Sequence, residues 1–180
     1  MNTYPYRTYA EIDLNKMQHN LRQVRAAIGP DCKLLFVLKA DAYGHGAVQV
    51  SRTLEELGAE YLAVSNLEEA VQLRRGGVNL PVLILGYTPP EFAPDEAEMA
   101  ITQEVHGLQY AKDLNKALDG TGKKLTVHLK IDTGMTRLGF FADQPEATLA
   151  ALVEVSQLPN LYIEGVFMHF CVSDSKKPED

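Results

Sequence analysis

Lys39 directly follows the apolar run of residues 34–38, Leu-Leu-Phe-Val-Leu. A short, wholly apolar run is typical of a strand that is buried on both faces in a parallel sheet. A lysine at the mouth of such a strand is partly removed from water, which favours the neutral, nucleophilic form of its amine. Such an amine can form a Schiff base. The alternative is a lysine that extends its charged end into solvent and has no chemical role.

Three further segments carry polar side chains immediately after predicted strands. Residues 40–46, Ala-Asp-Ala-Tyr-Gly-His-Gly, open a predicted helix, and the Tyr43 hydroxyl there could bind an oxyanion such as phosphate. Residues 132–139 place Arg137 in a glycine-flanked loop, where it could reach an anion or lie on the surface. His169 follows the last predicted strand, where a purely structural histidine is also common. In parallel βα folds such strand ends meet at the active site.

Hydrophobic spacing predicts alternating strands and helices along the chain. Strands are predicted over residues 9–13, 34–38, 61–64, 82–85, 101–105, 125–131 and 162–168. Helices are predicted to begin near residues 14, 47, 66, 88, 110 and 143. Asn66 is the predicted cap of its helix, with Glu69 three residues later and Arg74 in the last turn.

Six of these strands, from residue 34 onward, alternate with helices, which predicts a parallel sheet covered by helices. An open doubly wound sheet and a closed barrel both fit this order. No nucleotide motif of the GxGxxG or GxxxxGK[ST] type follows the first buried strand, which removes the commonest reasons for an open sheet. A (β/α)8 barrel needs eight units and about 250 residues. We therefore expect residues 1–180 to be the N-terminal part of a longer barrel, with a sheet edge that further chain would cover.

Four stretches, in order along the chain, resemble the alanine racemase family. VLKADAYGHG at residues 37–46 is similar, almost letter for letter, to the pyridoxal-phosphate attachment site of that family. LKIDTGMTRLGF at residues 129–140 resembles its second signature, and GVFMHF at residues 165–170 resembles the segment with a histidine after the sixth strand. AEIDL at residues 10–14 resembles the start of such enzymes. The resemblance therefore spans most of the chain.

The resemblance implies a (β/α)8 barrel of the fold-type III pyridoxal-phosphate enzymes and assigns roles to matching residues. Lys39 would hold pyridoxal 5'-phosphate as a Schiff base and exchange the α-proton on one face of the substrate. Tyr43 would bind the cofactor phosphate. Arg137 would hydrogen-bond the phenolic oxygen of the cofactor and lie near the substrate carboxylate, and His169 would lie against the pyridine ring.

Three more positions take their roles from the resemblance. Leu85 would be an apolar contact near the cofactor, and Met135 would lie beside the substrate. Lys130 matches a lysine that is often carbamylated and that steadies Arg137. The resemblance implies no metal ion.

The function implied by the resemblance is interconversion of L- and D-alanine for peptidoglycan synthesis. Racemisation needs acid–base groups on both faces of the α-carbon, and the family takes the second one, a tyrosine, from the C-terminal β domain of a partner subunit. We therefore expect a homodimer for the intact protein, a β domain that residues 1–180 lack, and no racemisation by this chain alone. The alternatives are a relative that prefers another amino acid such as serine, a same-barrel amino-acid decarboxylase, and a non-catalytic barrel that carries pyridoxal phosphate.

Composition narrows the class of partner. The chain has 180 residues, of which 46% are hydrophobic and 23% charged, and its formal net charge is −7. Negative charge with scattered basic residues argues against nucleic-acid binding. Apolar runs such as residues 34–38 are far shorter than the roughly 20 residues of a membrane span, and residues 1–10 do not resemble a secretory signal. We therefore expect a cytoplasmic protein whose partner is a small amino acid.

Overall fold

The computed structural model describes residues 8–177 and contains a parallel sheet flanked by helices. The strands are β1 (Leu35–Val37), β2 (Tyr61–Val64), β3 (Val82–Ile84), β4 (Ile101–Val105), β5 (Leu125–Asp132), β6 (Phe140–Phe141) and β7 (Leu161–Phe167). The first five strands pair in chain order, and β7 and the two-residue β6 both pair with β5. Residues 1–7, part of the segment predicted to hold no secretory signal, and residues 178–180 lie outside the described residues.

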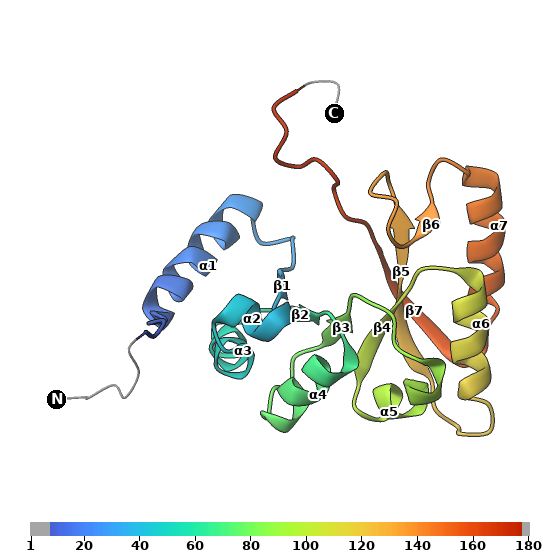
Figure 1. Ribbon diagram of the computed structural model, residues 1–180, viewed down its shortest axis with the longest axis horizontal. Coiled ribbons are helices and arrows are strands. Elements are labelled where there is room, and N and C mark those ends of the chain that lie inside the picture. Colours follow the sequence, from blue (N-terminus) through green and yellow to red (C-terminus); the bar gives the residue numbers. More distant parts are fainter. Residues whose placement is uncertain (1–7, 178–180) are drawn as a thin grey trace.

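The helices are α1 (Leu14–Ile28), α2 (Lys39–Gly44), α3 (Ala47–Glu56), α4 (Leu67–Arg75), the 3-10 helix η1 (Pro90–Phe92), α5 (Ala93–Glu98), α6 (Leu108–Ala117) and α7 (Pro145–Ser156). Helix α1 precedes the first strand, and the other helices lie between strands along the sequence. Helices α3 to α7 follow the outside of the sheet in an arc, while α1 lies at the β1 end (Figure 1). Successive parallel strands with helices on the outside are the arrangement of a partial (β/α)8 barrel, as the sequence predicts.

Several predicted elements are confirmed with their bounds. The strands over residues 61–64 and 101–105 have the predicted ends. Asn66 caps α4, because its side chain accepts the backbone N–H of Glu69 at 2.9 Å. Arg74 lies in the last turn of that helix, where a cation opposes the negative end of the helix dipole.

Two predictions near the N-terminus are wrong. Residues 9–13 form no strand; instead the Asp13 side chain accepts the N–H groups of Asn15 and Lys16 and so caps α1. Strand β1 is not buried on both faces, since Leu35 is 40% and Val37 is 38% exposed. Both side chains line an open cavity, and no described segment covers that face.

Two apolar clusters join the helices to the sheet. The first connects β1–β3 to α1, α3 and α4, and includes the fully buried Leu54, Leu62 and Leu73. The second connects β4, β5 and β7 to α6 and α7, and includes Leu114 and Leu125. Burying one leucine fully contributes about 1.5–3 kcal/mol, so helix packing on the outer face stabilises the strands that carry the candidate site.

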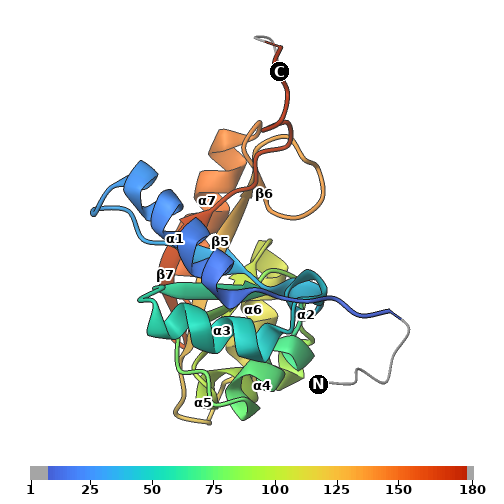
Figure 2. The ribbon, with the colours of Figure 1, turned by 90° about the vertical axis from the view of Figure 1, so that its left-hand side faces the viewer.

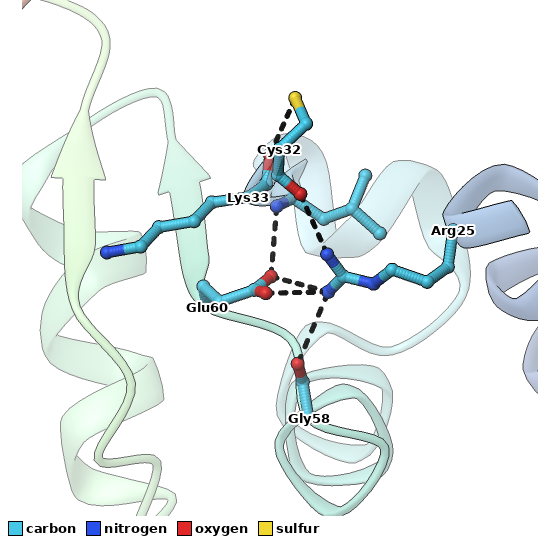
Figure 3. A network of polar contacts seen from close by, with 6 residues as sticks. Arg25, Cys32, Lys33, Gly58 and Glu60 are labelled. Atoms are coloured by element: carbon cyan, nitrogen blue, oxygen red, sulfur yellow. Dashed lines mark hydrogen bonds and ion pairs between the residues drawn. The ribbon is translucent and has the colours of Figure 1, made fainter. Parts of the chain in front are cut away.

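Arg25, in the last turn of α1, ties that helix to the starts of β1 and β2 (Figure 3). Its guanidinium lies 2.7 Å from both carboxylate oxygens of Glu60 and donates to the Cys32 carbonyl at 2.9 Å. Glu60 also accepts the backbone N–H of Leu34 at 2.9 Å, and the Arg25 hydrogen bond lowers the pKa of the Glu60 carboxyl. This network holds the C-terminal end of α1 at the starts of β1 and β2. In the view of Figure 2, α1 lies in front of the sheet.

The described part of the chain contains neither a membrane-spanning helix nor a metal-binding cluster. Within residues 8–177, no helix has both the length and the apolar character needed to cross a bilayer. The same residues contain no group of three or more His, Cys, Asp or Glu side chains placed to bind a metal ion.

Candidate active site

A cavity of about 560 Å³ opens at the C-terminal ends of the strands. Six of the seven predicted site residues line it: Lys39, Tyr43, Leu85, Lys130, Arg137 and His169. They come from the turn after β1, the end of β3, strand β5 with its following loop, and the segment after β7. Parallel strands end at the same edge of a sheet, so these distant segments share one site.

Met135 is the predicted site residue that the cavity does not include. It lines a narrow cleft next to the cavity, together with Lys130, Arg137 and His169. Met135 therefore lies in the loop that carries Arg137 but does not line the cavity around Lys39.

The turn that follows Lys39 is left-handed. Residues 40–43 all have φ between 52° and 55°, so α2 is one left-handed turn. The helix predicted to begin near residue 47 is confirmed, because the right-handed helix α3 begins at Ala47, directly after this segment. The left-handed geometry of residues 40–43 is not predicted. A left-handed conformation costs roughly 1–2 kcal/mol per non-glycine residue. The surrounding structure must therefore hold this turn, which presents the 60% exposed Tyr43 to the cavity.

Two carboxylates hold the turn by accepting backbone N–H groups. Glu69 of α4 accepts the N–H of Ala40 at 2.7 Å and both the N–H and the hydroxyl of Ser65 at 2.8 Å. Asp41 accepts the N–H of Ala47 at 2.7 Å and so caps the start of α3. Glu69 thus joins the ends of β1 and β2. Its position in the first turn of α4 does not predict this role.

The loop that carries Arg137 is held by Asp132 at the end of β5. The Asp132 carboxylate accepts the N–H groups of Gly134 and Thr136, each at 3.0 Å, and these bonds lower the pKa of its carboxyl. Gly139 ends the loop where a Cβ atom would lie 2.6 Å from the Asp132 backbone nitrogen, so only glycine fits there. The loop therefore returns tightly to β5 and adds the short strand β6, which the sequence does not predict.

Positive charge dominates the cavity. Lys39, Lys130 and Arg137 line it. Lys130 is buried. Burial is the main cause that lowers the pKa of its amine, and the nearby positive charge of Arg137 lowers it further. Lys39 is exposed in the described part of the chain. The prediction that its amine is partly removed from water is therefore wrong. Three cations around one apolar-walled cavity favour an anionic ligand.

His128 is a cavity residue that the predictions missed. Its Nε2 lies 2.9 Å from the Glu164 carboxylate of β7, and the same oxygen accepts the Tyr61 hydroxyl at 2.9 Å. The His128 hydrogen bond lowers the pKa of the Glu164 carboxyl. A Cβ atom at Gly165 would lie 3.0 Å from the His128 ring, so glycine leaves room for it. Side chains two residues apart on a strand point to the same face. His128 lies two residues before Lys130 on β5, so its place in the cavity could have been predicted.

A second groove, of about 640 Å³, lies between α4 and η1. Its walls are mainly apolar, with Val71 of α4 opposite Pro89 and Phe92. It contains none of the predicted site residues. The smaller cavity around Lys39 is therefore the candidate active site.

The comparisons with known proteins agree with this geometry. The family model for the alanine racemase N-terminal domain matches residues 12–180. The chain belongs to the alanine racemase family. An alanine racemase of Desulforamulus reducens is 42% identical over 168 residues, which are 93% of this chain and 45% of that protein.

Solved structures of the family match the fold closely. The alanine racemase of Clostridium difficile, in complex with cycloserine, is 40% identical with a TM-score of 0.92, over 98% of this chain and 48% of that one. A histidine racemase of Leuconostoc mesenteroides is 32% identical with a TM-score of 0.83, over 92% of this chain and 44% of that one. The chain thus spans about half the length of the relatives that it matches.

Proposed function

We propose that this chain forms the cofactor-binding half of a pyridoxal-phosphate-dependent alanine racemase, which interconverts L- and D-alanine for peptidoglycan synthesis. The observation that carries the proposal is the meeting of Lys39, Tyr43 and Arg137 in one cavity at the strand ends. All the relatives described above are amino-acid racemases, which favours this activity over a decarboxylase or a non-catalytic carrier.

The residues of the cavity fit pyridoxal phosphate. The cofactor combines an aldehyde, an aromatic ring and a phosphate dianion, and the cavity offers an amine, apolar walls and several cations. Lys39 supplies the amine, Leu85 an apolar wall, and the Tyr43 hydroxyl a donor for phosphate. When bound, the cofactor withdraws electrons from the α-carbon of the amino acid and so makes its proton acidic.

The side chains of this chain would divide the remaining work. Lys39 holds the cofactor and moves a proton to and from the α-carbon on one face. Arg137 offers a planar set of donors to the substrate carboxylate and the phenolic oxygen. Lys130 lies beside Arg137 and steadies it, and His169 and Met135 complete the wall on that side.

We assign the opposing acid–base group to a tyrosine from the C-terminal β domain of a partner subunit, as the family resemblance implies. Tyr61 and Tyr110, which lie within the described barrel, donate their hydroxyls to Glu164 and to the Thr88 carbonyl. The active enzyme is then a cytoplasmic homodimer, and the 180-residue chain alone does not racemise. A histidine racemase shares this fold at 32% identity, so the fold alone does not fix which amino acid is used.

Reduction with borohydride in the presence of pyridoxal phosphate, followed by peptide mapping, tests the assignment. The label is expected on Lys39 and is absent from the Lys39→Arg variant. A label on Lys33 or Lys130 instead would show that the assignment is wrong. A D-alanine to L-alanine assay on the protein expressed from its complete reading frame tests the activity itself.

A further inference from the structure

Glu96 of α5 is a buried carboxyl group that the proposed function does not use. Its side chain is fully buried, and neither carboxyl oxygen forms a hydrogen bond of good geometry within residues 8–177. Burial raises the pKa of this group to about 7, and the negative charge of Asp95 raises it further. An ionised carboxylate is costly to bury, so such a group keeps its proton unless a donor or a cation meets it.

Two hydroxyl groups beside Glu96 have already given their protons to other acceptors. Thr88 and Tyr110 are both close enough for their side chains to interact with the Glu96 carboxyl. The Thr88 hydroxyl donates to Oε1 of Gln103 at 2.8 Å, and the Tyr110 hydroxyl donates to the Thr88 carbonyl at 2.7 Å. Each hydroxyl has a single hydrogen. Neither can therefore donate to an ionised Glu96, whereas the Thr88 oxygen can still accept from a protonated one.

The side-chain amide of Gln103 fixes the direction of the Thr88 bond. Its Nε2 donates to the carbonyls of Gly86 and Glu104 at 2.8 and 2.9 Å, so its Oε1 is the end that accepts from Thr88. The Thr88 contact would lower the pKa of Glu96 if the hydroxyl donated to the carboxylate. Because that hydrogen is committed to Gln103, the contact instead suits the protonated acid.

The cations near the ends of α5 are engaged with other groups. The Lys123 amine lies 2.7 Å from the Glu98 carboxylate and also donates to the Pro94 carbonyl. The Arg74 guanidinium donates to four backbone carbonyls, which belong to Val78, Leu80, Met99 and Ala100. Neither cation therefore neutralises Glu96.

The elements that pack against α5 carry titratable groups that are acidic, already paired or turned toward the cavity. These are Glu91 of η1, Glu104 of β4 with its partner His106, Tyr110 of α6, Lys112 of α6 with its partner Glu154, and His128 and Lys130 of β5. Within the described residues, Glu96 is thus a buried acid with no cation to stabilise its ionised form.

The same hydrogen bonds connect Glu96 to the wall of the candidate active site. Thr88 donates to Gln103, Gln103 donates to the Gly86 carbonyl, and Gly86 lines the cavity. The backbone is tightly packed there, because a Cβ atom at Gly86 would lie 2.7 Å from the Ser65 carbonyl oxygen. A change at Glu96 therefore reaches the end of β3 through consecutive contacts.

We propose that Glu96 is a pH-sensitive switch, which is protonated and hydrogen-bonded to the Thr88 oxygen in the folded protein and loosens the end of β3 when it loses its proton to water. Ionisation leaves a buried charge without a partner, and opening of α5 toward solvent relieves it. The folded pKa lies above the unfolded value of about 4.3. The stability that the protonated acid contributes is therefore complete below the unfolded value and is lost as the pH rises toward about 7.

Infrared spectroscopy of the protein expressed from its complete reading frame tests whether Glu96 is protonated. At about pH 6 we expect a carboxylic-acid C=O band that Glu96→Gln lacks and that fades as the pH rises through the folded pKa. The control Glu98→Gln should keep the band, because Glu98 is exposed and paired with Lys123. Glu96→Met, a second neutral variant, should lack it too. A band of equal strength in the native protein and in both Glu96 variants would overturn the proposal.

Hydrogen exchange of the amides in residues 85–92 tests the link to the cavity. At about pH 4.5 the native protein and Glu96→Gln should exchange at nearly the same rate. At about pH 8 the native protein should exchange about tenfold faster or more, since each pKa unit is a factor of ten. Glu98→Gln should follow the native protein, and a ratio that does not change with pH would contradict the switch. Neither measurement needs cofactor or substrate, so its outcome is independent of the proposed function.

Discussion

The loop after Lys39 and the loop that carries Arg137 meet at the same cavity but are held in different ways. The Lys39 loop depends on Glu69, which belongs to α4 and is 29 residues away from the Ala40 N–H that it accepts. The Arg137 loop depends on Asp132, which accepts N–H groups only two and four residues away. Both devices are the same physically: a carboxylate fixes backbone amides and thereby fixes a side chain beside them.

The backbone conformations explain why the supports differ. The Lys39 loop places alanines and an aspartate in left-handed geometry, which is unfavourable without outside contacts. The Arg137 loop turns at Gly134 and Gly139, which adopt positive φ at little cost, and Thr136 is its single left-handed non-glycine residue. The first loop is therefore made by the tertiary structure, and the second is mostly made by its own sequence.

The largest expected effect is that of Lys39→Ala in the protein from its complete reading frame. Loss of one acid–base group costs about 10²–10⁴-fold in rate, and loss of cofactor attachment adds to it. Racemisation should therefore disappear in both directions. Assays starting from L- and from D-alanine measure this, with Lys33→Ala, an exposed neighbour before β1, as the control that retains activity. Equal losses in both variants would remove the special role of the Lys39 loop.

Glu69→Ala tests the claim that the Lys39 loop is supported from a distance. It leaves the N–H groups of Ala40 and Ser65 without their acceptor, a cost of about 1–3 kcal/mol. We expect weaker pyridoxal-phosphate binding by about tenfold or more, measured by absorbance titration. Glu68→Ala, an exposed neighbour on the same helix, is the matched control. Unchanged binding in the Glu69 variant would mean that the left-handed turn holds itself.

The same difference decides what the sequence can predict. The bounds of β2 and β4 and the Asn66 cap follow from patterns within a few residues. The turn at residues 40–43 does not, because its geometry is held by a carboxylate distant in sequence. The exposure of Leu35 and Lys39 also escapes prediction, since an apolar run does not reveal that one face borders an open cavity. His128 was missed although strand alternation with Lys130 indicates it.

Arg137→Lys tests whether the local loop delivers a specific side-chain shape. Lysine keeps the charge but loses the planar set of donors. We expect substrate or cofactor binding to weaken by about 1–3 kcal/mol, the scale of a hydrogen bond to a charged group. The KM for alanine and the cofactor Kd measure the effect, and Arg75→Lys in the separate groove beside α4 is the control. Native kinetics with lysine at position 137 would reduce Arg137 to a surface residue.

The smallest expected effect is the acid dependence of the Arg137 loop. Hydrogen bonds from Gly134 and Thr136 lower the pKa of Asp132 in the folded chain. The stabilisation by its carboxylate is therefore complete above the unfolded pKa of about 3.9 and is lost as the pH falls through the lower folded value. Asp132→Asn should be less stable than the native chain at neutral pH, and the gap should narrow in acid. Thermal unfolding across this range measures the gap, with the exposed Asp143→Asn as control. A gap that stays constant with pH would show that the loop is held by its glycines and not by the Asp132 charge.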